Sequence, residues 1–542
     1  MKLYFILVFY FLCNFSVFGQ ISALNSTDGS ILITPRGLKG KTNNGVSLGE
    51  NALFSNTTGG ANTAIGQSAM YANTTGYYNT GIGHYSLSSN TTGNSNVALG
   101  NFSLSSNTTG RLNTAVGYNA LFSNTTGYDN TANGSLSLSS NTTGILNTAT
   151  GTYALRSNTT GEENTATGYL SLNSNTTGSN NTANGVRALY SNTTGSANVA
   201  IGSSALNGNT TGDYNTALGI SSLYTNISGT NNVAVGNGSL EKNTIGSSNT
   251  GLGFQALYLN TTGNYNTAIG FLSLMSNTTG QWNIGLGEGA MKSNTTGFEN
   301  IAIGRAAMMS TQASKYDTFI GTRIAEQYTA GEQNTGLGFF AMRTFKSGGS
   351  NTAIGAYALE NIPSGNFNVA IGFSAGGNNG NLPIDYSTAI GTYSTVTTSN
   401  TMVFGAKNYT LRWAFGRNTT DYALQVGNDT NDGNGAFLTK GGTWTNASSR
   451  AFKENFKDIS DAEILSKVAQ LNIQKWSYKG TDETHIGPIA EEFEELFEVG
   501  VKGDKEHIST IDASGVALKA IRALLLKTEL LEKRIKELEN KK

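Results

Sequence analysis

Ser448 and Lys453 are the two residues of this 542-residue chain whose types and spacing could carry out covalent chemistry. A serine hydroxyl becomes a nucleophile when a base accepts its proton, and a lysine amine can be that base when burial or a nearby cation lowers its pKa. Arg450 places such a cation between them. A serine and a lysine at this spacing in a polar loop are more often simply solvated, so the pair alone predicts no catalysis.

His485 is a second candidate for acid–base chemistry, as a general base. It stands just before the turn at residues 487–488, so packing or capping is the alternative and the better explanation. The other histidines are His84 and His507, and the single cysteine, Cys13, lies near the start of the chain. Because metal sites in proteins are built mainly from clustered Cys, His and carboxylate ligands, we expect no metal site and no cofactor.

The charged residues of the chain are concentrated at its C-terminal end. Of the 69 Lys, Arg, Asp and Glu residues, 34 lie in residues 448–542, and the formal net charge of the whole chain is -1. This balance gives no electrostatic reason to expect nucleic acid or a membrane surface as a partner. The composition therefore predicts a polar, weakly charged body followed by a charged globular and helical end.

The first 19 residues have the pattern of a secretion signal. Lys2 gives a positive start, residues 3–18 are almost wholly apolar, and Gly19 is a small residue suited to cleavage. The apolar run is short for a membrane span, and no other candidate span occurs in the sequence. We expect a secreted or cell-surface protein, with no membrane span after signal removal and a lead-in over residues 20–44.

A phrase of 17 residues, repeated about twenty times, forms the body of the chain. One copy has Asn-Thr-Thr-Gly at residues 56–59, Asn-Thr-Ala-Ile-Gly at residues 62–66 and Ala-Met at residues 69–70. We expect each coil to hold a strand (Thr-Ala-Ile), a glycine corner, a second short strand (x-Ala-Leu) and an Asn-Thr-Thr-Gly turn. Asn-Thr-Thr also has the form of a glycosylation sequon, but turn chemistry explains it without sugar. Stacked coils spaced as β-strands give a rod about 100 Å long.

Two columns of the repeat are predicted to point into the coil: a small residue such as Ala64 and an aliphatic residue such as Met70. A third column is less regular, and we expect it to point inward too. Its aliphatic members give way to polar ones and then return: Ile65, Ile82, Leu99, Val116, Asn133, Thr150, Thr167, Asn184 and Ile201. Buried polar members would need hydrogen bonds, either in ladders between coils or at an interface with sister chains.

The phrase at residues 62–66, followed by Ala69, resembles the head repeat of trimeric autotransporter adhesins. In those heads a short Asn-x-Ala-Ile-Gly-x-x-Ala phrase builds a left-handed β-roll, and three rolls associate side by side. The resemblance covers residues 45–391, although the period here is longer than is usual in those heads. It implies a β-roll shaft and a homotrimer. Residues 392–447, with short strand patterns broken by Asn-Asp-Gly turns, are expected to form a β neck.

The charged end carries several separated motifs in a recognisable order, at residues 448–455, 473–478, 485–493 and 508–512. The series resembles the C-terminal intramolecular chaperone domain of phage tail spikes and endosialidases, peptidase family S74. The resemblance implies a small α+β domain over residues 448–542 that trimerises, guides folding of the preceding β stalk and then cuts itself off.

That resemblance also assigns roles to residues of this chain. Ser448 matches the nucleophile and Lys453 the base of a Ser–Lys dyad, with the cut beside Ser448. Arg450 and Asn455 match a related bacterial form of the motif, and Ser449 stands where the family usually has Asp. With His485, Arg450 and Asn455 are the supporting candidates.

The last 25 or so residues, about 516–540, have the spacing of a coiled coil. Apolar positions alternate in steps of four and three, with Thr528 as the one polar member: Ala517, Ile521, Leu524, Thr528, Leu531, Ile535 and Leu538. A helix that packs on its own domain is the alternative.

The sequence thus predicts a mostly β protein with a 17-residue-repeat β-solenoid shaft and a small chaperone domain that ends in a coiled-coil helix. The expected function is a secreted, trimeric, adhesin-like surface fibre. Its only expected enzymatic activity is a single self-cleavage as a serine endopeptidase. The alternative is a structural or ligand-binding rod, for glycan or ice, whose tail never cuts.

Overall fold

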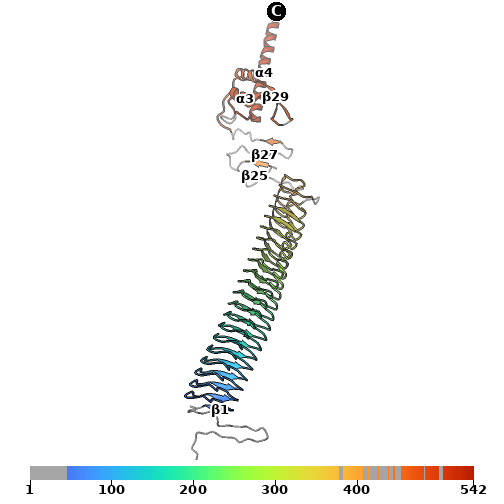
Figure 1. Ribbon diagram of the computed structural model, residues 1–542. Helices are drawn as coiled ribbons and strands as arrows, with labels where there is room; N and C mark the ends of the chain where they lie inside the picture. The colour runs from blue at the N-terminus through green and yellow to red at the C-terminus, as the bar shows by residue number, and fades with distance from the viewer. Residues whose placement is uncertain are drawn as a thin grey trace, which may run out of the picture. The chain divides into compact units, whose positions relative to one another are not determined.

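The computed structural model describes residues 45–377, 382–406, 413–415, 424–426, 437–438, 443–445, 453–480, 482–499 and 505–541. The chain divides into two compact units, Met1–Tyr409 and Thr410–Lys542. The first is the shaft and the second contains the C-terminal helices (Figure 1). The expected signal and lead-in, residues 1–44, lie outside the described residues.

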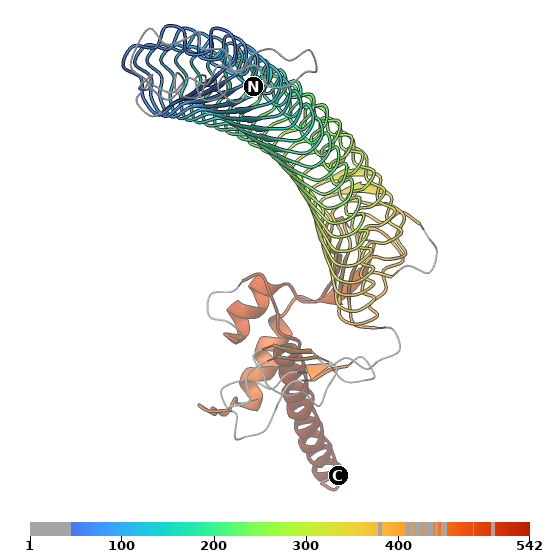
Figure 2. The ribbon, with the colours of Figure 1, turned by 90° about the horizontal axis from the view of Figure 1, so that it is seen from below.

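The shaft is a β-solenoid, as predicted, with one 22-stranded parallel sheet along its length. Each strand pairs with the equivalent residues of the next coil, for example Thr131 with Thr148 and Ala132 with Ala149. Seen along a second direction, the stack of coils curves along its length (Figure 2).

The strands of this sheet are β1 (Val46–Leu48), β2 (Thr63–Ile65), β3 (Thr80–Ile82), β4 (Val97–Leu99), β5 (Thr114–Val116), β6 (Thr131–Asn133), β7 (Thr148–Thr150), β8 (Thr165–Thr167), β9 (Thr182–Asn184), β10 (Val199–Ile201), β11 (Thr216–Leu218), β12 (Val233–Val235), β13 (Thr250–Leu252), β14 (Thr267–Ile269), β15 (Ile284–Leu286), β16 (Ile301–Ile303), β17 (Thr318–Ile320), β19 (Thr335–Leu337), β21 (Thr352–Ile354), β22 (Val369–Ile371), β23 (Thr388–Ile390) and β24 (Met402–Phe404). Two further strands, β18 (Ala330–Glu332) and β20 (Ser347–Gly349), pair with each other.

Each described coil has one long-sheet strand, so the expected second strand was wrong. The x-Ala-Leu stretch forms turns instead, because its aliphatic residue lies in the left-handed region, as at Leu138 with φ of 50°. The residue two positions earlier, Leu136, has φ of 58°. The backbone still bonds between coils, from Leu138 N to Ala154 O at 3.0 Å. Burial of the leucine, which is 0% exposed, offsets the cost of this conformation.

The third residue of each strand faces outward, so the expectation that this column points inward was also wrong. Ile82 is 39% exposed and Leu337 is 48% exposed, while the central residues of most strands, such as Ala98, are fully buried. This is the ordinary alternation of a strand. The polar members Asn133 and Thr150 are exposed as well, so they need no buried partners. We call this column the strand-face row.

Two columns of buried asparagines run inside the shaft and bond from coil to coil. In the turn column, Asn158 Nδ2 donates to Asn141 Oδ1 at 2.8 Å and to Gly161 O at 3.0 Å. In the strand column, Asn147 Nδ2 donates to Asn130 Oδ1 at 3.1 Å and to the same Gly161 carbonyl at 2.8 Å. The two ladders are therefore joined within each coil. The asparagines of the Asn-Thr-Thr-Gly turns are closed to glycan attachment in the folded shaft, because their amides are buried and bonded.

Two glycines of most coils are required by geometry. The corner glycine has a positive φ, as at Gly168 with φ of 124°, which side chains rarely adopt. The turn glycine lies against the ladder: a Cβ on Gly161 would sit 2.4 Å from both Asn158 Oδ1 and Gly178 O.

The turn-column ladder ends at Asn294, near the C-terminal end of the shaft. The equivalent position in the next coil is Thr311, which has no amide to donate, and Asn294 Oδ1 has no hydrogen-bond partner among the described residues. Beyond it the column becomes aromatic and aliphatic, with Tyr328 and Phe345 stacked at 6.1 Å between ring centroids. The later coils thus replace a polar ladder by an apolar core.

Asp317 takes an asparagine position in the strand column and is fully buried. Its carboxylate accepts from Tyr328 Oη at 2.9 Å, from Asn334 N at 2.8 Å and from Asn334 Nδ2 at 3.0 Å. Burial raises the pKa of this carboxyl, against the opposing effect of those hydrogen bonds. Burial and the neighbouring Asp317 also raise the pKa of Tyr328, which stays a proton donor.

The described residues of the second unit form four short neck strands, a hairpin and three helices. The neck strands, which pair in chain order, are β25 (Trp413–Phe415), β26 (Leu424–Val426), β27 (Phe437–Leu438) and β28 (Trp444–Thr445). The remaining elements are α2 (Asp461–Gln470), β29 (Gln474–Ser477), β30 (Thr484–Gly487), α3 (Ala490–Phe497) and α4 (Thr510–Glu539). Helix α4 begins earlier than the expected position near residue 516, because the Ser509 hydroxyl accepts from Ile511 N at 3.2 Å and caps it.

We predict that Asn147→Ala destabilises the shaft by about 3 kcal/mol, because it leaves buried ladder groups unpaired. The groups that lose a bond are Asn164 N and Nδ2, Asn130 Oδ1 and Gly161 O. Hydrogen exchange should report the loss as faster exchange in the adjoining coils, since a stacked repeat is stabilised by its nearest neighbours. The control is Thr143→Ala, which removes an exposed side chain from the turn that precedes Asn147. Equal exchange in the two variants would contradict a structural role for the ladder.

We predict that Asp317 makes part of the shaft less stable as pH rises. The folded-state pKa is raised, so the stability linked to the protonated carboxyl is complete below the unfolded pKa near 3.8 and is lost as pH rises through the folded value. Asp317→Asn/Tyr328→Phe gives this coil the Asn and Phe pair found as Asn334 and Phe345 in the next coil. In thermal unfolding at pH 4 and pH 8, the stability of the variant relative to the wild type should be higher at pH 8 than at pH 4. A constant difference would refute the assignment.

Candidate functional site

Lys453 and Asn455, two of the predicted site residues, lie in an irregular exposed stretch that leads into helix α2. Asn455 has a left-handed backbone with φ of 59°, which asparagine tolerates better than most side chains. The stretch ends at Ser460, whose hydroxyl accepts from Glu463 N at 3.1 Å and caps α2. Lys453 lies seven residues before this cap.

Ser448 and Arg450 lie outside the described residues. The Ser–Lys dyad therefore stays a prediction. The same holds for the position of the cut beside Ser448.

His485 lies on β30, directly opposite Trp476 of β29 in the antiparallel pair. Its ring centroid is 4.8 Å from that of Trp476 and 5.6 Å from that of Tyr478. Its Nε2 lies 3.9 Å from a Glu483 carboxylate oxygen, which is an ion-pair distance but too long for a hydrogen bond. His485 is thus one of three packed rings on a hairpin. Its supporting role in chemistry remains a prediction.

The hairpin also contains two buried ring nitrogens without hydrogen-bond partners among the described residues, Trp476 Nε1 and His485 Nε2. Buried polar groups are normally paired, and leaving one unpaired costs stability. Sequence reasoning identified His485 but missed Trp476. The sequence signal was only that Trp476 lies in the motif at residues 473–478, which precedes the His485 motif.

Helices α2 and α4 build a small hydrophobic core. Ile464 of α2 is 1% exposed and packs with Ala520 and Ala523 of α4. A salt bridge joins the same two helices, with Lys519 Nζ 2.6 Å from Asp461 Oδ1. Small alanines on α4 let the two helices approach closely, and Asp461 lies in the first turn of α2, where a carboxylate is favourable.

The rest of α4 exposes its apolar side chains. Ile521 is 64% exposed and Leu538 is 56% exposed, and other large apolar residues of α4 are exposed to a similar degree: Leu518, Leu524, Leu525, Leu530, Leu531 and Ile535. The predicted coiled-coil positions, apart from Ala517 and Thr528, lie within this set. Such a helix leaves an apolar surface uncovered in a single chain.

Within the part of the chain that the structure describes, no three His, Cys, Asp or Glu side chains come together as a metal site would require. None of the described helices is both long and apolar enough to cross a membrane.

Comparison with known families bears on the tail. Residues 448–502 match the family model Peptidase S74, described as "Chaperone of endosialidase". A search of curated proteins finds no match to the chain. The matched segment runs from Ser448 past α3 and stops before α4, so the predicted resemblance is confirmed for residues 448–502, and the long helix lies beyond it. The chain thus consists of a β-solenoid shaft followed by a segment similar to the chaperone of endosialidase family.

Proposed function

We propose that this protein is the subunit of a secreted, homotrimeric, adhesin-like surface fibre whose C-terminal domain, residues 448–542, assists trimerisation and folding and then cuts the chain beside Ser448. The observation that carries the proposal is the place of the family match, which begins at Ser448, downstream of a long β-solenoid. Export is supported by the apolar segment at residues 3–18.

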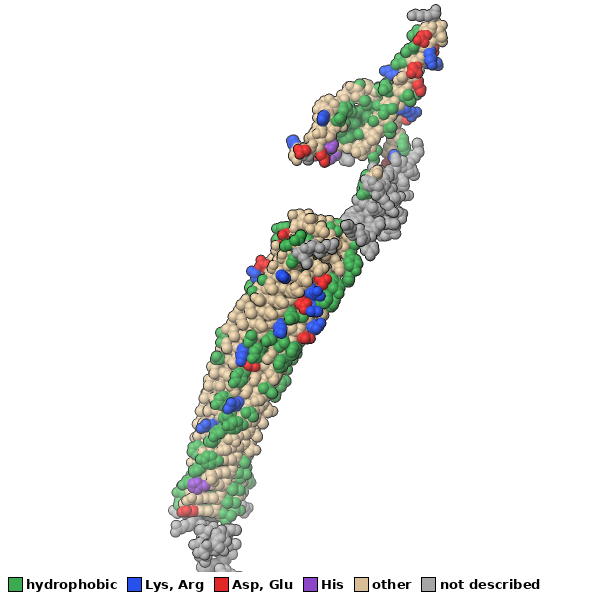
Figure 3. All heavy atoms as spheres, turned by 90° about the vertical axis from the view of Figure 1, so that its right-hand side faces the viewer, with side chains coloured by type: hydrophobic (Ala, Val, Ile, Leu, Met, Phe, Trp, Pro, Cys, Tyr) green, Lys and Arg blue, Asp and Glu red, His purple; other side chains and the backbone are tan. Residues whose placement is uncertain are grey.

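The surface of the shaft supports side-by-side association. The strand-face row is aliphatic in most coils and about two-fifths exposed, for example at Ile201, Leu252 and Ile371. Hydrophobic side chains gather in rows along the shaft in the space-filling view (Figure 3). Monomeric proteins rarely expose apolar surface that continues over so many elements. We infer that this row packs against the same row of sister chains, which would remove it from water.

The exposed apolar side chains of α4 support the same assembly at the other end of the chain. Steps of four and three between Ile521, Leu524, Leu531, Ile535 and Leu538 suit a parallel coiled coil. A helix end that associates in one register would align three chains before their shafts pair.

Alignment matters because the coils are nearly identical. A chain displaced by one coil would present almost the same strand-face row to its neighbours, so local contacts barely distinguish the correct register. A C-terminal domain that holds three chains at the same residue removes this ambiguity. Its release after folding would make the assembled fibre hard to reverse, since the element that promotes exchange of chains is lost.

The proposed cut uses the serine and lysine in named roles. Ser448 Oγ attacks the carbonyl carbon of the neighbouring peptide bond while Lys453 Nζ accepts the hydroxyl proton. The C–N bond breaks as Lys453 returns that proton to the leaving amine, and water hydrolyses the resulting ester. Each chain reacts once, in cis or between sister chains. Arg450, Asn455 and His485 are the supporting residues.

We predict that purified protein releases a C-terminal fragment of about 95 residues, since residues 448–542 form the proposed domain. Ser448→Ala and Lys453→Ala should abolish its release, because each removes one partner of the dyad. Intact-mass spectrometry after expression measures both species.

The control for this test is Ser449→Ala, which removes the adjacent hydroxyl and should leave cleavage in place. A wild-type chain that stays intact through folding would show that the tail acts without cutting, as in a structural rod. Loss of cleavage in Ser449→Ala, but not in Ser448→Ala, would identify Ser449 as the nucleophile in place of Ser448.

We predict that the fibre has about three times the mass of one 56.9 kDa chain before cleavage. Four substitutions in the strand-face row, Leu252→Asn, Ile269→Asn, Leu286→Asn and Ile303→Asn, should dissociate the shafts without unfolding them. Asparagine is compatible with this column because Asn133 and Asn184 occupy it in other coils. Light scattering on the intact chain gives the mass before cleavage, light scattering on the cleaved shaft reports the dissociation, and circular dichroism reports the fold.

The matched control carries asparagine at four exposed threonines of the Asn-Thr-Thr-Gly turns: Thr194, Thr211, Thr279 and Thr296. These substitutions lie outside the strand-face row and should leave the mass unchanged. A monomeric wild-type shaft, or a trimer that survives all four changes in the strand-face row, would rule out this interface.

A further inference from the structure

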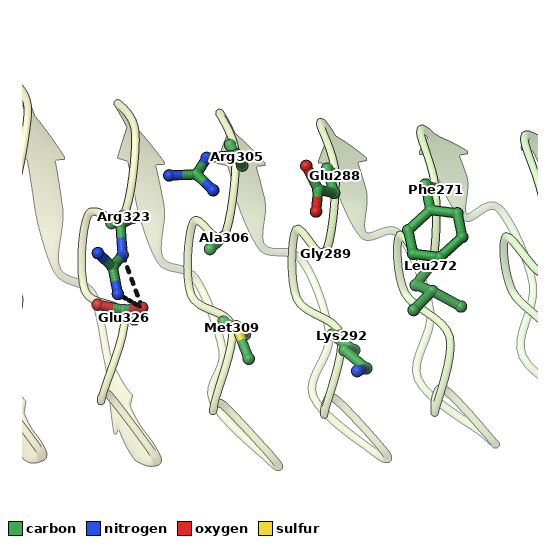
Figure 4. A pocket seen from close by; sticks show the side chains of 10 residues that line it. All are labelled: Phe271, Leu272, Glu288, Gly289, Lys292, Arg305, Ala306, Met309, Arg323 and Glu326. Carbon is green, nitrogen blue, oxygen red and sulfur yellow. Dashed lines mark hydrogen bonds and ion pairs between the residues drawn. The ribbon is translucent and has the colours of Figure 1, made fainter.

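A hollow of about 410 Å³ lies on the surface of the shaft, beside the strand-face row. Three rows of side chains form it (Figure 4). Phe271, Glu288 and Arg305 line one side, and Lys292, Met309 and Glu326 line the other, as the close-up shows.

The hollow exists because two consecutive coils have small residues in the middle row while the coils on either side have large ones. The middle row has Gly289 and Ala306 between Leu272 and Arg323. A Cβ built on Gly289 would meet nothing within 4 Å, whereas one on the turn or corner glycine of a typical coil would meet neighbouring backbone. The floor is therefore open and apolar, and the bulky side chains of Leu272 and Arg323 close its two ends.

Charge is concentrated in this stretch of the shaft. Residues 288–332 contain nine charged side chains, against ten in residues 45–287. At one end of the hollow, Arg323 Nη2 lies 2.8 Å from Glu326 Oε1, and its guanidinium lies 5.4 Å from the Phe340 ring centroid. These contacts fix Arg323 and neutralise Glu326.

Three other charged side chains around the hollow have no hydrogen bond or ion pair with any of the described residues: Glu288, Lys292 and Arg305. Two cations and one carboxylate leave an excess positive charge, which favours a ligand with an anionic group. The remaining carboxylate, Glu288, can accept hydrogen bonds from hydroxyl groups.

The backbone offers a ligand little in the middle row, because its amides already bond between coils. Gly289 N donates to Phe271 O at 2.9 Å, Ala306 N to Glu288 O at 2.8 Å and Arg323 N to Arg305 O at 2.7 Å. A peptide that relies on main-chain hydrogen bonds would find these donors taken. A ligand must instead be recognised by side chains, through its charge, its hydroxyls and an apolar face.

We propose that this hollow binds a saccharide unit that carries one acidic group. Arg305 and Lys292 bind the carboxylate or sulfate, Glu288 accepts from ring hydroxyls, and Phe271 and Leu272 contact the apolar face of the ring. The site lies within the shaft and is independent of cleavage at the tail. It gives the fibre a defined ligand class at one place along an otherwise repetitive surface.

The test is isothermal titration calorimetry on the full chain with trigalacturonic acid, a sulfated chondroitin disaccharide and neutral maltotriose. We expect at least one of the acidic probes to bind and maltotriose not to bind. The two acidic probes distinguish a carboxylate from a sulfate as the recognised group. Arg305→Ala should weaken binding about tenfold, the loss typical of a charge-assisted hydrogen bond. Arg111→Ala, a shaft arginine over the Tyr128 ring, should not change the affinity.

Ala306→Leu fills the hollow without an obvious cost to the fold. Ala306 has φ of 54°, and leucine is already present in the same column at Leu272 with φ of 55°. It should abolish binding, whereas Ser221→Leu, in the same column at φ of 54°, should bind like the wild type. The proposal is overturned if no acidic probe binds, if maltotriose binds equally well, or if Ala306→Leu retains the wild-type affinity.

Discussion

The buried asparagine ladder is the interaction on which the shaft depends. Each coil encloses little apolar volume, mainly one alanine and one leucine such as Ala132 and Leu138. Such a small core could not hold a coil closed by itself, so amides at fixed positions tie each coil to the next. The carbonyl of Gly161 accepts from both Asn147 and Asn158 and so joins the two ladders. Since every amide needs its neighbour's amide, a single coil has no stable form of its own.

This mode of stabilisation creates the assembly problem that the tail would solve. A ladder of identical amides can form its hydrogen bonds in any register that matches one coil to another. A strand-face row of similar aliphatic residues can likewise pack in any such register. The coils near the C-terminal end differ: Asp317, Tyr328 and Phe345 occur at positions that are asparagine in most other coils. A register shifted by one coil would place these residues against different ones, so these coils distinguish the correct register from a shifted one. Register is therefore best defined at the end of the shaft that precedes the chaperone-like segment.

The sequence predicted the solenoid and its period because a fixed 17-residue step leaves few other folds. It did not predict which columns face outward: the hydrophobicity of Ile82 suggested an inward column, but alternation along the strand places it outside. The predicted second strand does not form, because leucines such as Leu138 adopt a left-handed backbone, which no propensity scale favours. In the tail, the motif series could not reveal that His485 contacts Trp476, because the contact depends on hairpin register. The hollow was equally hidden, since the importance of Gly289 appears only when neighbouring coils are stacked.

The difference between inward and outward positions within one coil explains how a highly repetitive protein can have a specific surface. Positions that face inward are almost invariant from coil to coil, because the ladders and the small core allow few alternatives. Outward positions meet no such demand, so they change freely: Phe271, Glu288 and Arg305 are successive residues of one column. Any binding specificity of the shaft must therefore come from the outward columns, where neighbouring coils place variable side chains about 4.8 Å apart. A ligand that spans two or three coils contacts several of these variable side chains at once.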